Sequence, residues 1–372
     1  MADLDIARKT PLFDLHNELG GKVVEFAGWA MPVNYPAGIL GEHRQARQKA
    51  ALFDVSHMGQ VELRGANAAR ALEALVPAAI DGLAPGKARY TQFTNEQGGI
   101  LDDLIVTNAG DHLFMVVNAS MREQDLAHMR ANLAGVDVIE RADLALLAVQ
   151  GPMAETVVAA LAPRAADLFF MESATMDIIG APCRVSRLGY TGEDGYEISI
   201  AADRAEALAR ALLDHPDCAP AGLGARDSLR LEAGLCLYGN DIGPDTSPVE
   251  AGLSWSIQKR RRQEGGFPGE ERIRRELDEG PSRKLVGIRP AGRAPARHGV
   301  EIADGAGKVI GEITSGGFGP TVEGPVSMGY VVASHAAPGT AVQLMIRGRA
   351  EPATVQALPF VQQNYKRQGT TR

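Results

Sequence analysis

A polar and charged segment divides this chain into two parts that differ in composition. Between Lys259 and Lys284 the sequence contains the basic stretch Lys259–Arg262, then several glycines, and then a charged run that predicts a short helix from Glu270 to Leu277. Segments of this composition usually connect domains. We therefore expect at least two domains, in agreement with a length of 372 residues, which is more than one hydrophobic core usually organises.

The part before this segment alternates strands with helices. Within residues 60–149, apolar runs typical of strands lie at Gln60–Leu63, Tyr90–Phe93, Ile100–Val106, His112–Val117 and Leu144–Val149. Asn67 is expected to cap a first helix, and Ser120 with Glu123 has the pattern of a capping box for a second one. This order is that of a ferredoxin-like α+β unit. A hairpin followed by a helix recurs at Cys183–Leu213.

The part after the segment contains strand patterns without helices. Short apolar runs follow one another from Leu285 to Ala357, and glycines separate them. Regularly spaced short strands with glycine turns predict a small β-barrel or jelly-roll domain.

The charges are distributed unevenly along the chain. Residues 1–250 carry 20 Lys and Arg against 35 Asp and Glu, whereas residues 251–372 carry 18 against 11. Nucleic-acid-binding proteins are usually basic with interleaved aromatic residues, which make up only 5% here, so no nucleic acid is expected as a partner. We interpret the basic stretch Lys259–Arg262 either as a solvated linker or as a docking patch for an acidic partner.

Several function classes lack support in the sequence. No apolar run reaches the roughly 18 residues of a membrane span, and Met1–Lys9 lacks the basic start and apolar stretch of a secretory signal. The three cysteines, Cys183, Cys218 and Cys236, are too scattered for a disulfide framework or a zinc site, which favours a reducing compartment. No phosphate loop, dinucleotide fingerprint or nucleophile elbow is present.

Two adjacent carboxylates interrupt an otherwise apolar strand. Asp102 and Asp103 follow Ile100 and Leu101, and apolar residues continue to Val106. Side chains alternate along a strand, so the two carboxylates point to opposite faces and at least one is expected to face the interior or a cleft. Burying an unpaired charge is costly, which favours a functional carboxylate over a structural one. The alternative is that both lie near a sheet edge and cap turns.

Glu197 and Arg226 are two further candidates. Glu197 opens a strand, where its carboxylate could accept two parallel N–H bonds from a planar heterocycle; an edge-strand Glu in solvent fits the sequence equally well. Arg226 lies near the start of a predicted helix, where the dipole disfavours a cation, and it has no acidic neighbour three or four residues away. Its partner is expected elsewhere, such as Glu197 or a ligand, unless Arg226 is solvated.

Ordered blocks along nearly the whole chain resemble the glycine cleavage system T-protein family of aminomethyltransferases. The matching blocks are Phe26–Trp29 with Met31–Val33, Phe53–Gly59, Gly98–Val106, Gly189–Glu197, Ala225–Asp241, Pro248–Glu250, Thr314–Gly316, Met328–Tyr330, and Phe360–Val361 with Asn364–Tyr365. The resemblance implies an α+β fold of three domains arranged like a cloverleaf around a central tunnel that binds tetrahydrofolate. It implies ferredoxin-like units and a C-terminal β-barrel or jelly-roll domain.

On this basis we assign four regions. Residues 1–59 with 150–265 are expected to form a first, discontinuous folate-binding domain, and residues 60–149 a ferredoxin-like domain. Residues 266–284 are expected to be a linker, and residues 285–372 the C-terminal barrel domain.

The resemblance also implies roles for individual residues. Asp103 is the catalytic carboxylate, with a share of that role left open for Asp102, and Glu197 and Arg226 hold the pterin end of the folate. Tyr365 is a further substrate contact. The second-rank candidates for lining the tunnel are Met58, Tyr90, Asn118, Tyr190, Trp255 and Arg297.

The reaction implied by the family starts from an aminomethyl group on the lipoyl arm of the small acidic H-protein. It ends with ammonia, the dihydrolipoyl arm and 5,10-methylenetetrahydrofolate. The expected partners are therefore lipoylated H-protein and folate, with no metal and no membrane. Because the one-carbon unit passes through iminium-like species, the chemistry needs a carboxylate that stabilises positive charge and moves protons.

Two alternatives remain open from the sequence. One is a tetrahydrofolate-dependent demethylase on the same fold, against which the close match over Ala225–Gly239 counts. The other is a folate-binding maintenance protein for iron–sulfur or RNA metabolism, whose K-G-C-Y-x-G-Q-E signature matches Gly234–Asp241 only at Cys236 and Gly239. The expected location is the cytoplasm in a bacterium or the mitochondrial matrix in a eukaryote, although no transit peptide is seen.

Overall fold

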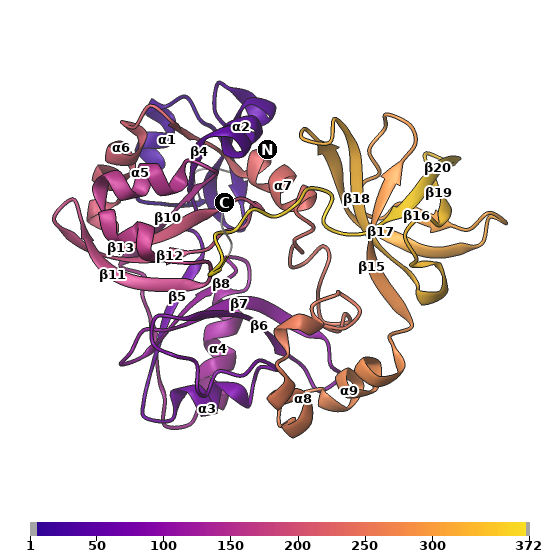
Figure 1. Ribbon diagram of the computed structural model, residues 1–372, viewed down its shortest axis with the longest axis horizontal. Helices are drawn as coiled ribbons and strands as arrows, with labels where there is room; N and C mark the ends of the chain where they lie inside the picture. Colours follow the sequence, from indigo (N-terminus) through magenta and orange to yellow (C-terminus); the bar gives the residue numbers. More distant parts are fainter. Residues whose placement is uncertain (1–5, 370–372) are drawn as a thin grey trace.

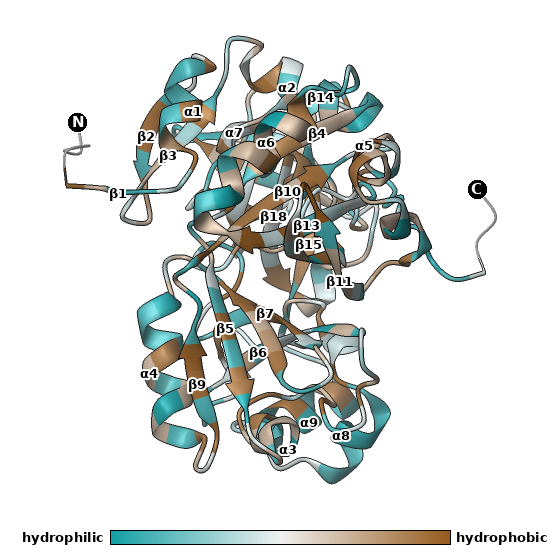
Figure 2. Cartoon of the chain, turned by 90° about the vertical axis from the view of Figure 1, so that its left-hand side faces the viewer, coloured by the Kyte–Doolittle hydropathy of each residue, from teal (hydrophilic) through white to brown (hydrophobic). Residues whose placement is uncertain are grey.

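The computed structural model describes residues 6–369, and its elements form three lobes (Figure 1). Residues 1–5, which make up most of the stretch considered for a targeting signal, lie outside the described residues. Within the described part, no helix is both long and apolar enough to cross a membrane. In Figure 2 the strands are largely brown, whereas α4 (Arg122–Asn132) carries both teal and brown, as expected for a helix with one buried side.

The first lobe is built on a six-stranded sheet. Its order is β11 (Glu172–Ile178), β12 (Ala181–Arg187), β13 (Gly195–Ala201), β10 (Leu144–Gln150), β4 (Ala50–Asp54) and β14 (Cys218–Pro220). The central strand β10 is apolar on both faces. Leu147 packs in a core with α5 (Ala154–Leu161) and α6 (Ala205–Leu213), whereas Leu146 packs in a second core with α2 (Gly38–Gln48) and α7 (Leu223–Glu232). Helices therefore cover one face of this sheet and, over β4 and β10, part of the other.

A small three-stranded sheet completes the first lobe. Its order is β1 (Arg8–Lys9), β3 (Trp29–Asn34) and β2 (Lys22–Phe26), and α1 (Phe13–Glu18) lies between β1 and β2 in the chain.

The second lobe is an antiparallel five-stranded sheet with helices on one face. The strand order is β6 (Ala88–Thr94), β7 (Ile100–Asn108), β8 (Leu113–Val117), β5 (Gly59–Arg64) and β9 (Asp137–Glu140). One face packs against α3 (Ala68–Glu73) and α4, with Phe93, Leu104 and Met129 in the shared core. The other face is free of these helices, and it carries Asp103.

The structure corrects two expectations for residues 60–149. The run Leu144–Val149 is a strand, but it pairs with β4 and β13 in the first lobe, and β9 closes the five-stranded sheet instead. We therefore propose that the boundary between these two domains falls between β9 and β10. The side-chain caps are also absent: Asn67 is the N-cap residue of α3 but makes no capping hydrogen bond, and the N-cap residue of α4 is Met121 instead of Ser120, also without one.

The third lobe is a closed six-stranded barrel, which confirms the prediction of a β-barrel. Its order is β15 (Arg283–Pro290), β18 (Gly324–Val332), β17 (Val309–Gly319), β16 (Glu301–Ala303), β19 (Ala341–Ile346) and β20 (Arg349–Gln356). Side chains such as Ile288, Ile313 and Leu344 fill the interior. After β20 the chain returns to the first lobe, where Asn364 N donates a hydrogen bond to Gly192 O (2.8 Å). Figure 1 shows this C-terminal segment crossing between the two lobes.

The basic stretch is helical, and two of its arginines contact the acidic Glu73 of α3. It forms α8 (Lys259–Glu264), and α9 (Glu270–Glu279) follows as predicted. The Arg261 side chain is buried and donates to the backbone carbonyl of Glu73, while the Arg260 guanidinium pairs with the Glu73 carboxylate. The interpretation as a solvated linker is wrong for Arg261, which is buried, whereas a docking patch that uses the exposed Lys259 and Arg262 stays a prediction.

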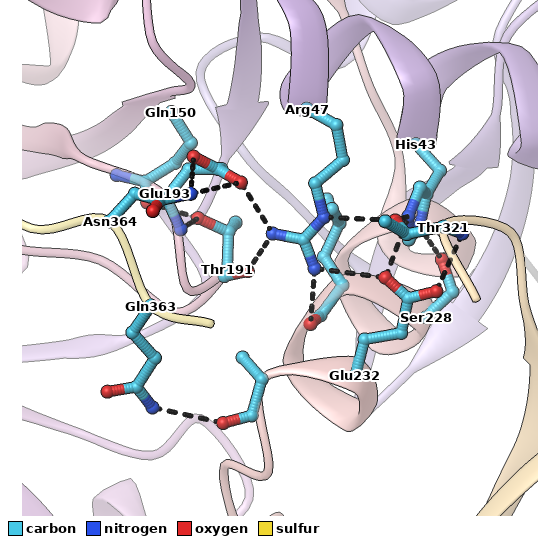
Figure 3. Close-up of polar contacts among 12 residues, drawn as sticks. His43, Arg47, Gln150, Thr191, Glu193, Ser228, Glu232, Thr321, Gln363 and Asn364 are labelled. Carbon is cyan, nitrogen blue, oxygen red and sulfur yellow. Dashed lines mark hydrogen bonds and ion pairs between the residues drawn. The ribbon is translucent and has the colours of Figure 1, made fainter. Parts of the chain in front are cut away.

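A buried polar junction joins the lobes near the C-terminal segment (Figure 3). Arg47 on α2 pairs with Glu193 (3.0 Å) and with Glu232 on α7 (3.1 Å). The Glu232 carboxylate also accepts from the backbone N–H of Thr321 in the barrel (2.8 Å), and Glu193 accepts from Asn364 Nδ2 (3.1 Å). Burial raises the pKa of Glu232. Hydrogen bonds and nearby positive charge outweigh this effect and lower the pKa to about 2. The junction fixes the loop that carries Tyr190 relative to the barrel.

Candidate functional site

Asp103 and Asp102 lie next to each other on β7 and face opposite sides of the five-stranded sheet, as the alternation predicts. Residues 100, 102, 104 and 106 are buried on the helix-covered face, and Asp102 is completely buried. Asp103 shares the other face with Ile105. The interpretation that both cap turns at a sheet edge is wrong, because β7 lies between β6 and β8.

Neutral hydrogen-bond donors hold the Asp103 carboxyl group. The Tyr90 hydroxyl donates to Oδ2 (3.0 Å), and Asn118 Nδ2 donates to Oδ1 (2.8 Å). Burial raises the pKa of Asp103, and the charge of Asp102 raises it further. The two hydrogen bonds lower it in part, so the pKa is about 7. A carboxyl group with this pKa exchanges protons readily at neutral pH, which is the property of a general acid–base.

Aromatic side chains flank this carboxyl group. The Trp255 ring stacks on the Tyr90 ring with centroids 5.3 Å apart and is 62% exposed, so it forms the outer edge of the site. The Tyr190 hydroxyl donates to the backbone carbonyl of Cys236. The charges of Arg230, Asp103 and Arg226 all act on the Tyr190 hydroxyl.

Glu197 and Arg226 form a second polar group. Burial raises the pKa of Glu197, and the positive charge of Arg226 lowers it. The Arg226 guanidinium lies 4.7 Å from the centre of the Tyr190 ring, and its buried Nη1 has no hydrogen-bond partner. Among the described residues, no ion pair joins the two side chains. Buried polar atoms of this kind are usually satisfied by a partner, so Arg226 Nη1 is left for a ligand.

His57 belongs to the same group and was missed in the sequence. It is 3% exposed, and its Nδ1 has no hydrogen-bond partner. Burial lowers the pKa of His57, the charge of Asp54 raises it, and the charge of Arg226 lowers it further. The resulting pKa is about 4, so the ring is neutral at pH 7. The signal was present only in the block Phe53–Gly59, from which we selected Met58. Met58 packs against the apolar cluster that contains Phe53 and Leu146, and its role in lining the site stays a prediction.

A pocket lies between the facing surfaces of the six-stranded and five-stranded sheets. Its lining is Ile105, Thr107, Phe114, Val116, Leu146, Arg184, Ser186, Leu188, Glu197 and Ser199. Ile105 follows Asp103 on the same face of β7, and Glu197 lies on β13 of the opposite sheet. Of the predicted site residues, Glu197 lines this pocket, and Asp103 lies beside it, two residues before Ile105 on the same face of β7.

Two predicted residues lie elsewhere. The Tyr365 ring stacks on Phe170 with centroids 4.0 Å apart, and the Arg367 guanidinium lies over the Tyr365 ring at 5.7 Å. Arg297 is exposed in the loop before β16 of the barrel. A role of either residue in substrate binding stays a prediction.

The fold and site define a class: a three-lobed α+β protein with a C-terminal barrel and a polar pocket between two sheets. Residues 12–261 match the model of the GCVT N-terminal domain, and residues 283–362 match that of the glycine cleavage T-protein C-terminal barrel domain. The chain belongs to the glycine cleavage T-protein family.

Relatives and a solved structure agree with this assignment. The mitochondrial aminomethyltransferase of Solanum tuberosum is 47% identical over 98% of this chain and 92% of its own length. That of Gallus gallus is 47% identical over 96% of this chain and 93% of its own length. The crystal structure of the glycine cleavage system aminomethyltransferase T from Bartonella henselae superposes with a TM-score of 0.92 at 42% identity, covering 97% of this chain and 99% of that one.

These matches bear on the alternatives and on location. They do not favour the demethylase or the maintenance protein, since the matched proteins are named as aminomethyltransferases over nearly their full lengths. The plant and bird relatives are named mitochondrial, which gives no support to a cytoplasmic location for this chain. The expectation of cytoplasm in a bacterium or matrix in a eukaryote stays a prediction.

Proposed function

We propose that this aminomethyltransferase of the glycine cleavage system moves the one-carbon unit from the lipoyl arm of H-protein to tetrahydrofolate, with Asp103 as the catalytic carboxyl group. The products are 5,10-methylenetetrahydrofolate, ammonia and the dihydrolipoyl arm. The observation that carries this assignment is the Asp103 carboxyl with a pKa of about 7, beside a pocket whose other wall bears Glu197.

The free polar atoms of the site fit a pterin ring. The ring has a 2-amino group and an N3–H side by side, which match the two acceptor oxygens of the Glu197 carboxylate. It also has a carbonyl oxygen, which matches a donor such as the unpartnered Arg226 Nη1. The neutral His57 ring offers one more hydrogen-bonding nitrogen on this side. These groups support a role in holding the pterin end of the substrate.

The bonds that change define what Asp103 has to do. The C–S and C–N bonds of the aminomethyl group break, and the carbon forms two new bonds, one each to N5 and N10 of the folate. Each folate nitrogen loses one proton, and the two protons end on the sulfur and on the ammonia. Asp103 can accept and pass on such a proton because its pKa is about 7, and in its ionised form it stabilises the positively charged carbon.

Tyr90, Asn118 and Trp255 have supporting roles in this proposal. Tyr90 and Asn118 fix the two oxygens of the Asp103 carboxyl by hydrogen bonds. Trp255, stacked on Tyr90 and mostly exposed, offers an aromatic surface at the edge of the site for the part of the folate that extends towards solvent.

The decisive experiment is an ammonia-release assay with aminomethyl-loaded, lipoylated H-protein. Tetrahydrofolate should accelerate ammonia release and 5,10-methylenetetrahydrofolate should form in equal amount. The loaded carrier is first shown to react with an established T-protein. If that carrier reacts with the established enzyme but not with this chain, the proposed substrate is wrong and a small methylated amine or sulfonium compound becomes the next substrate to assay.

A further inference from the structure

Asp102 is a buried carboxylate that the proposed mechanism does not use. Its side chain is completely buried on the face of β7 that packs against α4. Asn118 donates to it twice, from Nδ2 to Oδ1 (2.8 Å) and from the backbone N–H to Oδ2 (3.2 Å). The same Nδ2 donates to Asp103 Oδ1 (2.8 Å), so the position of this amide depends on both carboxyl groups.

A third carboxyl group lies behind Asp102. Asp125 on α4 is 1% exposed, its carboxyl group interacts with that of Asp102, and its buried Oδ2 has no hydrogen-bond partner among the described residues. Two buried carboxyl groups in contact hold one proton between them, because two adjacent charges repel in a medium of low polarity. Burial and the charge of Asp102 raise the pKa of Asp125 to about 10, so Asp125 carries the proton and donates it to Asp102.

We propose that Asp125 is a positioning residue for the reaction, acting on Asp103 through Asp102 and the Asn118 amide. The inference rests on the proposed function of Asp103. Burial raises the pKa of Asp102, and the interaction with Asp125 opposes this by favouring the charged form of Asp102. The Asp102 carboxylate then orients Asn118, and its negative charge raises the proton affinity of Asp103.

The direction of the effect follows from these contacts. Without the Asp125 donor, Asp102 loses an interaction that favours its charged form, so its pKa rises further and it takes up a proton more readily. A neutral Asp102 no longer repels the charge on Asp103, so the pKa of Asp103 falls. The titratable groups whose charges interact with Asp103 are Asp102, Asp125, Tyr90, Tyr190, Cys236 and Tyr238. Burial raises the pKa of the tyrosines and the cysteine, so only the carboxyl groups change charge near pH 7.

The test compares Asp125→Leu, which removes the donor, with Asp125→Asn, which keeps an N–H donor of similar shape. In Asp125→Leu, the apparent pKa in the pH profile of kcat should move down by about one unit, the effect of removing one neighbouring charge. KM for folate should stay within twofold, and Asp125→Asn should restore the parent profile. Glu123→Gln, which removes an exposed carboxylate from the same helix, is the matched control.

Two further measurements separate the possible failures. Asp102→Asn also neutralises Asp102, so it should lower the pKa of Asp103 even if Asp125→Leu does not fold. Carbon-13 NMR of labelled aspartate, with Asp103→Asn for assignment, reports the Asp103 titration directly without turnover. If the NMR pKa shifts but neither parent nor variants turn over H-protein, the proposed function fails, and only the effect of Asp125 on the Asp103 titration stands. An unchanged Asp103 titration in folded Asp125→Leu or in Asp102→Asn overturns the inference.

Discussion

Asp102 and Asp103 point to opposite faces of one strand, yet both accept a hydrogen bond from the same nitrogen, Nδ2 of Asn118, at 2.8 Å each. The arrangement is made by the end of β8, where Asn118 follows the last paired residue, Val117, opposite Leu104. One side chain at a strand end thereby connects the core face of the sheet to the face that bears the pocket.

Replacing Asp103 by Asn should abolish most turnover while leaving folate binding nearly unchanged. The amide keeps the shape of the side chain but neither carries the charge nor exchanges the proton, so kcat should fall by roughly 10²- to 10⁴-fold. Single-turnover ammonia release and calorimetric titration with folate measure the two effects. If Asp102→Asn has this effect and Asp103→Asn does not, the catalytic role belongs to Asp102.

The same Asp103→Asn variant should be more stable than the parent at pH 8 but not at pH 4. The folded protein binds the Asp103 proton more tightly than the unfolded chain, since its pKa is about 7 instead of 3.8. Asp103 therefore makes its full contribution to the free energy of unfolding below pH 3.8. This contribution falls by at most about 4 kcal/mol as the pH rises to 7. Thermal unfolding of both proteins at the two pH values tests this, and equal differences at both would contradict it.

Glu197→Gln should weaken folate binding by roughly 1.5 to 3 kcal/mol, the range for a hydrogen bond to a charged group. Arg226→Met should also weaken it, because Nη1 is buried without a partner and is left for the ligand. Ser199→Ala, on the same face of β13, serves as the control for a change in the pocket wall. An unchanged affinity of Glu197→Gln in titration calorimetry would remove Glu197 from the binding site.

Glu232→Gln should lower the stability of the folded protein at pH 7 by about 3 kcal/mol, since the Glu232 pKa is lowered from 4.5 to about 2. A carboxylate whose pKa is lowered by folding stabilises the protein at pH values above its pKa in the unfolded chain. This stabilisation is lost as the pH falls from 4.5 towards 2. The difference between variant and parent in urea unfolding should therefore shrink at pH 3. A difference that stays constant between pH 7 and pH 3 would show that lost packing, and not the charge, causes it.

Arg261→Met should destabilise the protein, whereas Lys259→Met should not. Arg261 is buried and donates to the carbonyls of Glu73 and Val76, which would be left without this donor, at a cost of roughly 1 to 3 kcal/mol. Lys259 on the same helix is exposed. Urea midpoints of the two variants provide the comparison, and equal midpoints would mean that α8 is held by other contacts.

The sequence by itself determined the local elements, and its resemblance to a known family supplied the site residues whose roles are proposed above. The strand patterns over residues 100–106 and 196–200, the helix near Glu270 and the barrel strands are all present, because alternation and glycine turns are local properties of the chain. Alternation alone also placed Asp102 and Asp103 on opposite faces.

Tertiary structure decided which elements pair and which charges meet. The run Leu144–Val149 is apolar on both faces, a pattern that fits the middle of any covered sheet, and only its pairing with β4 and β13 places it in the first lobe. Likewise, the basic stretch gave no sign of Glu73, which lies about 190 residues earlier in the chain. Packing between distant segments also produces the contact of Asp125 with Asp102. It likewise buries His57 Nδ1 without a hydrogen-bond partner. Hydrogen bonds and desolvation depend on distances in space, and a local sequence pattern does not contain them.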